Sequence, residues 1–298
     1  MKVIVSGASG LVGKALCARL AEREHQVLRL VRRASISADE IQWHPDQGRL
    51  NGRQLMGVDA ACHLAGENIA AGRWNAARKE RIEESRVEGT HLLAETLANA
   101  DQGPRVLVSA SAIGFYGDRG DEWLDEEAAQ GSGFLPDVCN AWEQAANPAR
   151  EAGIRVVHPR IGVVLSAEGG ALARMLLPFK LGLGGPIGNG RNWTSWITLD
   201  DLVEMIIFAI EDDRLEGPVN AVAPHPERFK DFARILGRVL SRPAFLPLPA
   251  FVAKLALGEM AEALLMASAR VRAGRLSSAG FSFKHESLET ALRHVLGR

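Results

Sequence analysis

Three glycines near the N-terminus have the spacing of a phosphate-binding turn. The run Gly7-Ala8-Ser9-Gly10-Leu11-Val12-Gly13 follows a short apolar segment and opens a helical pattern. In such a turn the first glycine permits a sharp bend, the second lets the backbone approach a pyrophosphate, and the third allows close packing of helix on strand. The helix N-terminus then offers free N–H groups to phosphates. The pattern predicts dinucleotide contacts from Gly7, Ser9, Gly10, Leu11 and Val12, whereas the alternative is a purely structural turn.

The residues after the second apolar segment indicate which dinucleotide would bind. NAD-specific sites place Asp or Glu about 20 residues beyond the glycine turn. Here Val31 is followed by Arg32 and Arg33, and the first carboxylate is Asp39. Guanidinium groups suit a ribose 2′-phosphate through charge-assisted hydrogen bonds. We therefore predict NADP(H) as the cofactor; the alternative is that both arginines are solvated residues at a strand end.

Two hydroxyls and one carboxylate are candidates for acid–base catalysis. Ser111 and Tyr116 follow an expected strand, in a loop that should lie at the carboxyl edge of the sheet and could polarise a carbonyl oxygen. Glu67 follows another strand and could be a general base, because a desolvated site raises a carboxyl pKa. The alternatives are a loop-packing tyrosine, a strand-end cap at Ser111, and an ion-pair role for Glu67 with Arg73 or Arg86.

Further ligand contacts are expected where neighbouring strands end. Leu64-Ala65-Gly66 closes one strand, and Ser109 closes the next and should touch the cofactor through its backbone. Arg160 ends a buried run, so it should reach the same edge of the sheet. There it could clamp a phosphate or carboxylate group, or it could pair with Glu143.

The cysteines and histidines give no sign of a metal site or a disulfide framework. Cys17, Cys62 and Cys139 have no paired spacing, which excludes a Cys-based zinc site. The histidines lack metal-ligand spacing in the sequence, so we predict no metal. His63 lies in an apolar run and is expected in the core. Nothing near Cys139 would depress its pKa, so no reactive role is expected for that thiol.

Alternating strands and helices must position these residues. Strands are expected at 2–6, 26–31, 58–64, 105–110 and 154–158, and helices at 11–24, 74–99 and 134–152. Apolar strands that alternate with helices indicate a parallel sheet covered on both faces. The predicted fold class is therefore α/β, a Rossmann-type doubly wound parallel sheet.

The alternation ends near residue 165. A glycine-rich segment spans 181–190, and a helix at 200–212 and a strand at 219–222 follow it. We expect residues 1–165 to form the dinucleotide-binding domain, rejoined by about 197–222. Residues 166–196 and 223–298 should form a smaller, mainly helical substrate domain, with the ligand in the crevice between the two.

Composition excludes several classes of protein. The chain has 35 Lys and Arg against 36 Asp and Glu, for a formal net charge of −1. It therefore has no excess of positive charge that would indicate binding to nucleic acid or to an anionic membrane. The apolar runs are too short or too interrupted to span a bilayer, and the N-terminus lacks a cleavage-site pattern. We expect a cytoplasmic protein with a small-molecule substrate, as a monomer or a homodimer.

Several of these motifs resemble one superfamily. The glycine turn, His63-Leu64-Ala65-Gly66 and Ser109-Ala110-Ser111 ahead of Phe115-Tyr116-Gly117 are similar to the extended short-chain dehydrogenase/reductases. Three runs further resemble an epimerase-like subfamily with its own C-terminal domain: Gly66-Glu67-Asn68, Trp142-Glu143 and Ala279-Gly280-Phe281. The resemblance covers essentially the whole chain. It implies a dinucleotide-binding fold and nucleotide-sugar epimerase or dehydratase ancestry, but no known substrate.

One departure from the superfamily bears on catalysis. Its members use a Tyr-x-x-x-Lys pair for proton transfer, but the only tyrosine here is Tyr116, and Gly120 stands four residues later. Alignment on Glu143 puts Leu135 and Cys139 at the Tyr and Lys positions, where neither does that proton chemistry. Two functions stay open: an NADP(H)-dependent oxidoreductase or epimerase for a small polar substrate such as a sugar nucleotide, and a non-catalytic NADP(H)-binding sensor or interaction protein.

Overall fold

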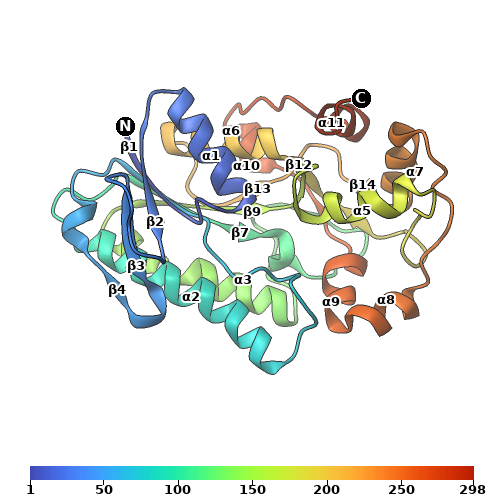
Figure 1. The fold of residues 1–298 in the computed structure, drawn as a ribbon, viewed down its shortest axis with the longest axis horizontal. Coiled ribbons are helices and arrows are strands. Elements are labelled where there is room, and N and C mark those ends of the chain that lie inside the picture. Colours follow the sequence, from blue (N-terminus) through green and yellow to red (C-terminus); the bar gives the residue numbers. More distant parts are fainter.

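The computed structural model describes all 298 residues and is built around one parallel sheet (Figure 1). Its strand order is β13-β9-β6-β5-β1-β2-β3-β4, with only the β3–β4 pair antiparallel and with β7 beside β9. The strands are β1 (Lys2–Ser6), β2 (Gln26–Val31), β3 (Glu40–His44), β4 (Arg49–Leu50), β5 (Ala60–His63), β6 (Val106–Ser109), β7 (Ser111–Ala112), β9 (Arg155–Ile161) and β13 (Gly217–Ala221).

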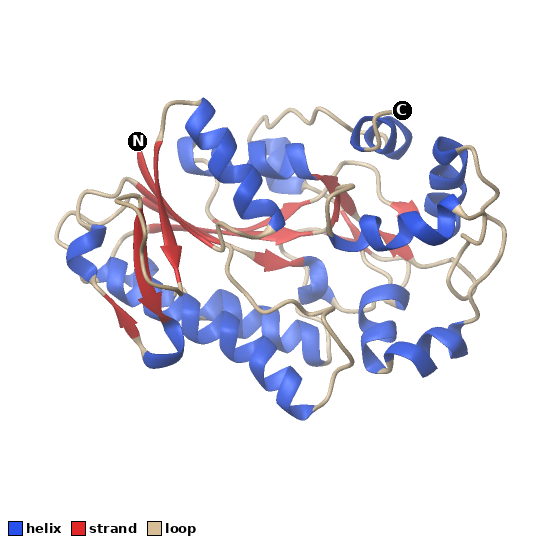
Figure 2. Cartoon of the chain, in the orientation of Figure 1, coloured by secondary structure: helices blue, strands red, loops and turns tan.

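Helices cover both faces of this sheet (Figure 2). Val3 and Val5 of β1 share one apolar core with α1 (Leu11–Glu22) and α6 (Leu199–Glu211). Ile4, which points the other way, belongs to a second core with α2 (Ala76–Ala98) and α4 (Asn147–Glu151). Successive residues of a strand face opposite sides of the sheet, so this division follows from the apolar run in β1. The predicted Rossmann-type doubly wound sheet is confirmed.

Some predicted boundaries need correction. The single helix expected over 134–152 is two helices, α3 (Phe134–Gln144) and α4, and Pro148 stands in the first turn of α4. Proline is tolerated there because the first N–H groups of a helix have no intrahelical acceptor. The β3–β4 hairpin, which falls within 40–50, was not predicted, because its strands are short and lie at the sheet edge.

Five helices form what we call the C-terminal lobe: α5 (Gly170–Lys180), α7 (Phe229–Leu240), α8 (Ala250–Leu257), α9 (Glu259–Ala261) and α11 (Leu288–Val295). A third apolar core joins α5, α7 and α11 around Trp196. This part is not purely helical, since β11 (Trp193–Thr194) pairs with β14 (Glu227–Arg228) and β10 (Val163–Leu165) pairs with β12 (Trp196–Thr198). None of the helices combines the length and apolar character that a membrane span requires.

Candidate functional site

The glycine turn forms a close-fitting cradle between β1 and α1. Gly7 has a φ of +70°, and a Cβ there would lie 2.7 Å from the carbonyl oxygen of Leu64. A Cβ on Gly13 would lie 2.2 Å from the carbonyl oxygen of Gly7. Only glycine fits these two positions, because the first needs a left-handed backbone and both approach other backbone atoms. The turn is therefore shaped by close backbone approach and is not just a stretch of small residues.

The N-terminus of α1 is open to an anion. Gly10 is its N-cap and provides no side-chain cap, and no acidic residue occupies the first turn. Ser9 and Gly10 are exposed, and Leu11 and Val12 are half-buried behind them. The first N–H groups of the helix thus have neither a capping oxygen nor a competing carboxylate, which is the arrangement that binds pyrophosphate. These residues fit a dinucleotide.

The two arginines after β2 differ in their surroundings. Arg33 donates two hydrogen bonds to Glu40, of 2.8 and 2.7 Å, and the Glu40 side chain is buried. The guanidinium of Arg33 holds the pKa of Glu40 below its ordinary value. Arg32 is exposed beside it. Arg33 is thus fixed by a carboxylate that sequence analysis did not connect to it, and is not simply solvated.

A serine missed in the sequence analysis organises the end of β5. The Ser6 hydroxyl bonds to the His63 ring nitrogen Nδ1 at 2.7 Å and accepts hydrogen bonds from the N–H groups of Leu64 and Ala65, at 3.2 and 3.4 Å. His63 is fully buried, and burial lowers its pKa to about 4. Ser6 therefore fixes the Leu64-Ala65-Gly66 segment against the glycine cradle, and His63 is a core residue as predicted.

Glu67 lies near the cradle on the loop after β5. Its N–H donates to the Ser85 hydroxyl at 3.0 Å, and its carbonyl accepts from Arg86 at 3.1 Å. The carboxylate is 37% exposed and lies 3.6 Å from the Arg78 guanidinium. The backbone of Glu67 is held firmly while its carboxylate has only a loose partner, so the carboxylate can turn toward a ligand.

Ser109 and Ser111 both lie buried at the carboxyl edge, but their hydroxyls differ in their partners. The Ser109 hydroxyl has no hydrogen-bond partner. The Ser111 hydroxyl donates to Glu143 Oε1 at 2.7 Å. Because a serine has one proton to donate, Ser111 can only accept from any further partner.

Arg160 is not free to clamp a ligand. Its side chain is 4% exposed, and it donates from Nε and Nη2 to the two oxygens of Glu143, at 2.8 and 2.9 Å. The guanidinium also stacks on the Phe115 ring, 3.5 Å from its centroid. Of the two interpretations of Arg160, the pairing with Glu143 is the arrangement found, because a buried guanidinium needs a buried carboxylate.

Tyr116 lies in the core, so its phenol does not have the open position on the loop that was expected from the sequence. Its hydroxyl donates to Asn220 Oδ1 at 2.7 Å and accepts from Arg160 Nη1 at 3.1 Å. The side chain is completely buried, and burial raises its pKa to about 12. The short helical turn from Ile113 to Tyr116 directs the ring inward toward β13, so the phenol serves this polar network.

The positions that would carry the Tyr-x-x-x-Lys pair face the same turn. A Cβ on Gly114 would lie 3.5 Å from Leu135 Cβ and 3.6 Å from Cys139 Sγ, so both side chains of α3 approach η3 (Ile113–Tyr116). Cys139 is buried, and burial raises the pKa of its thiol to about 12. Neither residue supplies an acid or a base near neutral pH.

The C-terminal lobe contacts α1, α2 and the loop after β5. A Cβ on Gly169, just before α5, would lie 3.5 Å from a Leu11 methyl group. Arg174 of α5 donates to the carbonyl of Ala70 at 2.9 Å, and Lys79 of α2 pairs with Glu259 of α9 at 2.5 Å. The lobe therefore rests on the first turn of α1 and on the loop after β5.

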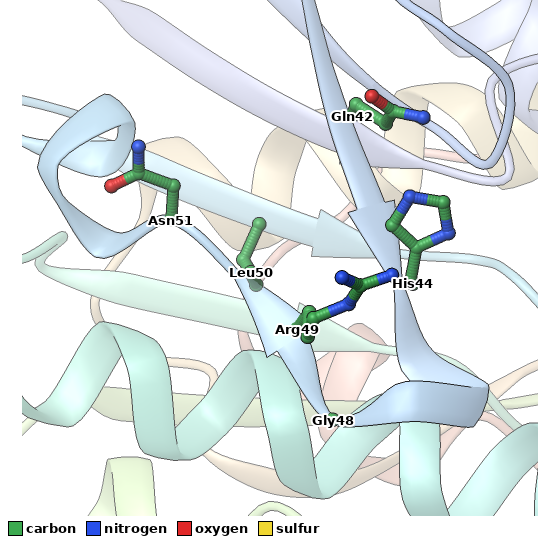
Figure 3. Close-up of a pocket in the computed structure, with 6 residues that line it drawn as sticks. All are labelled: Gln42, His44, Gly48, Arg49, Leu50 and Asn51. Atoms are coloured by element: carbon green, nitrogen blue, oxygen red, sulfur yellow. The ribbon is translucent and has the colours of Figure 1, made fainter.

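A shallow hollow of about 530 Å³ lies elsewhere, along the outer β3–β4 hairpin (Figure 3). It is lined by Gln42, His44, Gly48, Arg49, Leu50 and Asn51. None of the cradle residues lines it, so it is not part of the dinucleotide site.

A glycine cradle at the edge of a doubly wound sheet, with an uncapped helix N-terminus, defines a Rossmann-type dinucleotide-binding protein. A family model described as the NAD dependent epimerase/dehydratase family matches residues 3–222, and a domain of unknown function (DUF1731) matches residues 248–295. The chain belongs to the NAD dependent epimerase/dehydratase family, and the resemblance inferred from its motifs is confirmed.

Similar proteins span the whole chain. The epimerase family protein Mb2239 of Mycobacterium bovis is 42% identical over 296 residues, which cover 99% of this chain and 98% of that protein. The crystal structure of human epimerase family protein SDR39U1 with NADPH is 34% identical, covers 100% of both chains and has a TM-score of 0.93. A nucleoside-diphosphate sugar epimerase structure from Corynebacterium glutamicum is 38% identical, with a TM-score of 0.83, and covers 100% of this chain and 58% of that one.

Proposed function

We propose that this protein is an NADP(H)-dependent oxidoreductase that acts on a small, hydroxyl-bearing polar substrate. The observation that carries the proposal is the cradle of Gly7, Gly10 and Gly13 at the uncapped start of α1. The NADPH in the human relative's structure supports the choice of cofactor. When bound, NADP(H) would supply or accept a hydride at its nicotinamide ring.

Arg32 and Arg33 would bind the 2′-phosphate. Arg33 donates two hydrogen bonds to Glu40 and one to the carbonyl of Ala34. A guanidinium has five donors, so two stay free, and the bonds to Glu40 fix the direction in which they point. Exposed Arg32 adds a second cation that no carboxylate neutralises. A pre-positioned arginine beside an exposed one favours a phosphate over a ribose hydroxyl.

Ser111 would contact the substrate as a hydrogen-bond acceptor. Its proton is committed to Glu143, and Arg160 holds both oxygens of that carboxylate. The lone pairs of Ser111 therefore suit a substrate hydroxyl or an amide N–H better than a carbonyl oxygen. This replaces the carbonyl-polarising role expected from the sequence, and it favours an alcohol or a sugar as the bound form.

Glu67 stays the candidate general base, and Tyr116 is not used as a proton donor in this proposal. The carboxylate of Glu67 is partly exposed on a loop whose backbone is fixed, at the side of the sheet where β5 ends. The phenol of Tyr116 is enclosed by Asn220 and Arg160. A base must reach the proton that it removes, and of the two only Glu67 has that freedom.

The cofactor proposal is tested by fluorescence titration of the protein with NADPH and with NADH. We expect NADPH to bind at least about tenfold more tightly. The double variant Arg32→Ala/Arg33→Ala should lose about ten- to a hundredfold in NADPH affinity, as expected for charge-assisted bonds, with NADH binding unchanged. Arg234→Ala, at an exposed arginine paired with Asp231, is the matched control. Equal affinity for the two dinucleotides, or an equal loss in the control, would contradict the proposal.

A non-catalytic NADP(H)-binding protein is the second candidate. It is favoured by the absence of an acid–base pair at Leu135 and Cys139 and by the internal bonding of the Ser111 and Tyr116 hydroxyls. A crystal structure with NADP⁺ separates the two functions. An open polar space beside nicotinamide C4, within reach of Ser111 or Glu67, would support an enzyme. A nicotinamide sealed by apolar side chains would support the binding protein.

A further inference from the structure

Two histidines and an aspartate converge on the surface at the start of α6. Asp200 lies in the first turn of α6, His285 lies in the segment before α11, and His294 lies in the last turn of α11. One ligand atom from each falls within 4.8 Å of the others. The Nε2 atom of His294 is 2.6 Å from Asp200 Oδ2, and the two imidazole rings stack with centroids 4.3 Å apart. All three side chains are at least partly exposed.

The backbone holds these side chains in place before any ligand arrives. The neighbouring Asp201 is fully buried and accepts hydrogen bonds from the N–H groups of Lys284 and His285, at 2.8 and 3.1 Å. His285 is thereby fixed relative to the first turn of α6. Helix α11 is anchored through Leu288 and Leu292, which lie in the core of the C-terminal lobe. A pre-positioned set of ligands loses little conformational entropy when an ion binds.

The donor set matches a borderline transition metal. Two ring nitrogens and one carboxylate oxygen suit Zn²⁺, whereas Mg²⁺ and Ca²⁺ take oxygen ligands. Nearby cations are already paired, Lys284 with Glu204 at 3.3 Å and Arg293 with Glu289 at 2.8 Å, so they do not oppose a divalent ion.

We propose that Asp200, His285 and His294 form a Zn²⁺ site with a fourth position open to water. The hydrogen bond between Asp200 and His294 is replaced by two coordinate bonds of about 2.0–2.2 Å, which requires only small side-chain rotations. Because α6 packs on the sheet and α11 is the last helix of the chain, the ion fastens the C-terminal lobe to the dinucleotide-binding part of the fold (Figure 1).

The test uses the full-length chain after EDTA treatment and removal of the chelator. We expect calorimetric titration with ZnCl₂ to show one ion per chain, and a hundredfold excess over the Kd to raise the Tm by about 5 °C. Titration with Co²⁺ should give the visible absorption of a four-coordinate centre. The double variant His285→Gln/His294→Gln should lose the binding and the Tm shift. His91→Gln, at an exposed histidine on α2, should keep both.

Three results would contradict the proposed Zn²⁺ site. The first is an absence of Zn²⁺ binding by the wild-type chain, and the second is undiminished binding by the double variant. The third is an equal Tm shift with MgCl₂, which would show a nonspecific ionic effect and not nitrogen coordination. Asp200→Asn gives a further check that needs no histidine change, because it removes the charged ligand from an exposed position and should weaken Zn²⁺ binding at least about tenfold.

Discussion

The Ser111 hydroxyl donates a 2.7 Å hydrogen bond to the Glu143 carboxylate, so this buried serine at the carboxyl edge of the sheet is oriented by a residue of α3. Glu143 in turn receives two hydrogen bonds from Arg160 of β9. In this arrangement one carboxylate both neutralises a buried cation and sets the direction of the serine lone pairs. Fold stability and the orientation of the Ser111 hydroxyl are therefore coupled at Glu143.

Removing Glu143 should destabilise the fold strongly. Glu143→Ala leaves the Arg160 guanidinium buried without a counter-ion, which typically costs about 3–5 kcal/mol, and Glu143→Gln should cost less because it keeps a hydrogen-bond acceptor. Urea unfolding measures the free energy of both variants. Glu289→Ala, which breaks two partly exposed ion pairs with Arg238 and Arg293, is the control and should have little effect. Equal losses for Glu143→Ala and the control would contradict a structural role for the pair.

Tyr116→Phe should weaken the fold without affecting ligand chemistry. The ring packing is kept, but Asn220 Oδ1 loses its donor inside the protein, at a cost of about 1–3 kcal/mol. Thermal unfolding and NADPH titration measure the two effects separately, and NADPH affinity should stay within about twofold of the wild type. If turnover were found for the wild type and abolished in a folded variant, Tyr116 would be the proton donor that its loop position first suggested.

Gly13→Ala should disable the cradle. The added methyl group would lie 2.2 Å from the Gly7 carbonyl oxygen, so α1 must move away from β1 and from the bound pyrophosphate. We expect a loss of NADPH affinity of at least about tenfold, together with a lower Tm. Gly52→Ala is the matched control, because its Cβ would make only an ordinary contact of 3.4 Å with Thr96. Tight NADPH binding by Gly13→Ala would contradict the proposal that the glycine cradle binds the dinucleotide.

Stability should fall as the pH drops from about 6.5 to about 4. Burial lowers the pKa of His63 and of His158 from 6.5 to about 4, so below pH 6.5 the unfolded chain binds two protons that the folded chain does not. The loss is about 3 kcal/mol for each histidine and is complete near pH 4. Urea unfolding at several pH values, with EDTA present, measures it. His158→Asn should halve the dependence of the unfolding free energy on pH, whereas His91→Gln should leave it unchanged. An unfolding free energy that does not change between pH 6.5 and 4 would contradict the link to these two buried histidines.

Local patterns in the sequence were enough to predict the central sheet. The apolar runs and the glycine turn are continuous in the chain, and a parallel sheet with helices on both faces is the standard way to bury such runs. The helix break before Pro148 was missed because its signal is weak beside the surrounding helical periodicity. The β3–β4 hairpin was missed because β4 has only two residues and the hairpin lies at the sheet edge.

The chemistry of the site depends on partners that are far apart in the sequence. Tyr116 and Asn220 are 104 residues apart, and no spacing rule connects them. The fold likewise brings Asp200 to His285 and His294, so the prediction of no metal considered only spacing along the chain, and the proposed Zn²⁺ site departs from it. Sequence patterns identified the backbone turn proposed to hold the cofactor, but not the side-chain pairs that decide what each hydroxyl can donate.

The buried phenol at position 116 is the only tyrosine in the chain, beside six tryptophans. Its pKa of about 12 separates it from a solvent-exposed phenol, which ionises near pH 10. Phenolate absorbance during an alkaline titration would therefore come from one identified side chain in one hydrogen-bond network. The ionisation of Tyr116 therefore reports, in the absorbance of the intact protein, when the hydrogen bonds of its hydroxyl with Arg160 and Asn220 are broken and the ring becomes accessible to water.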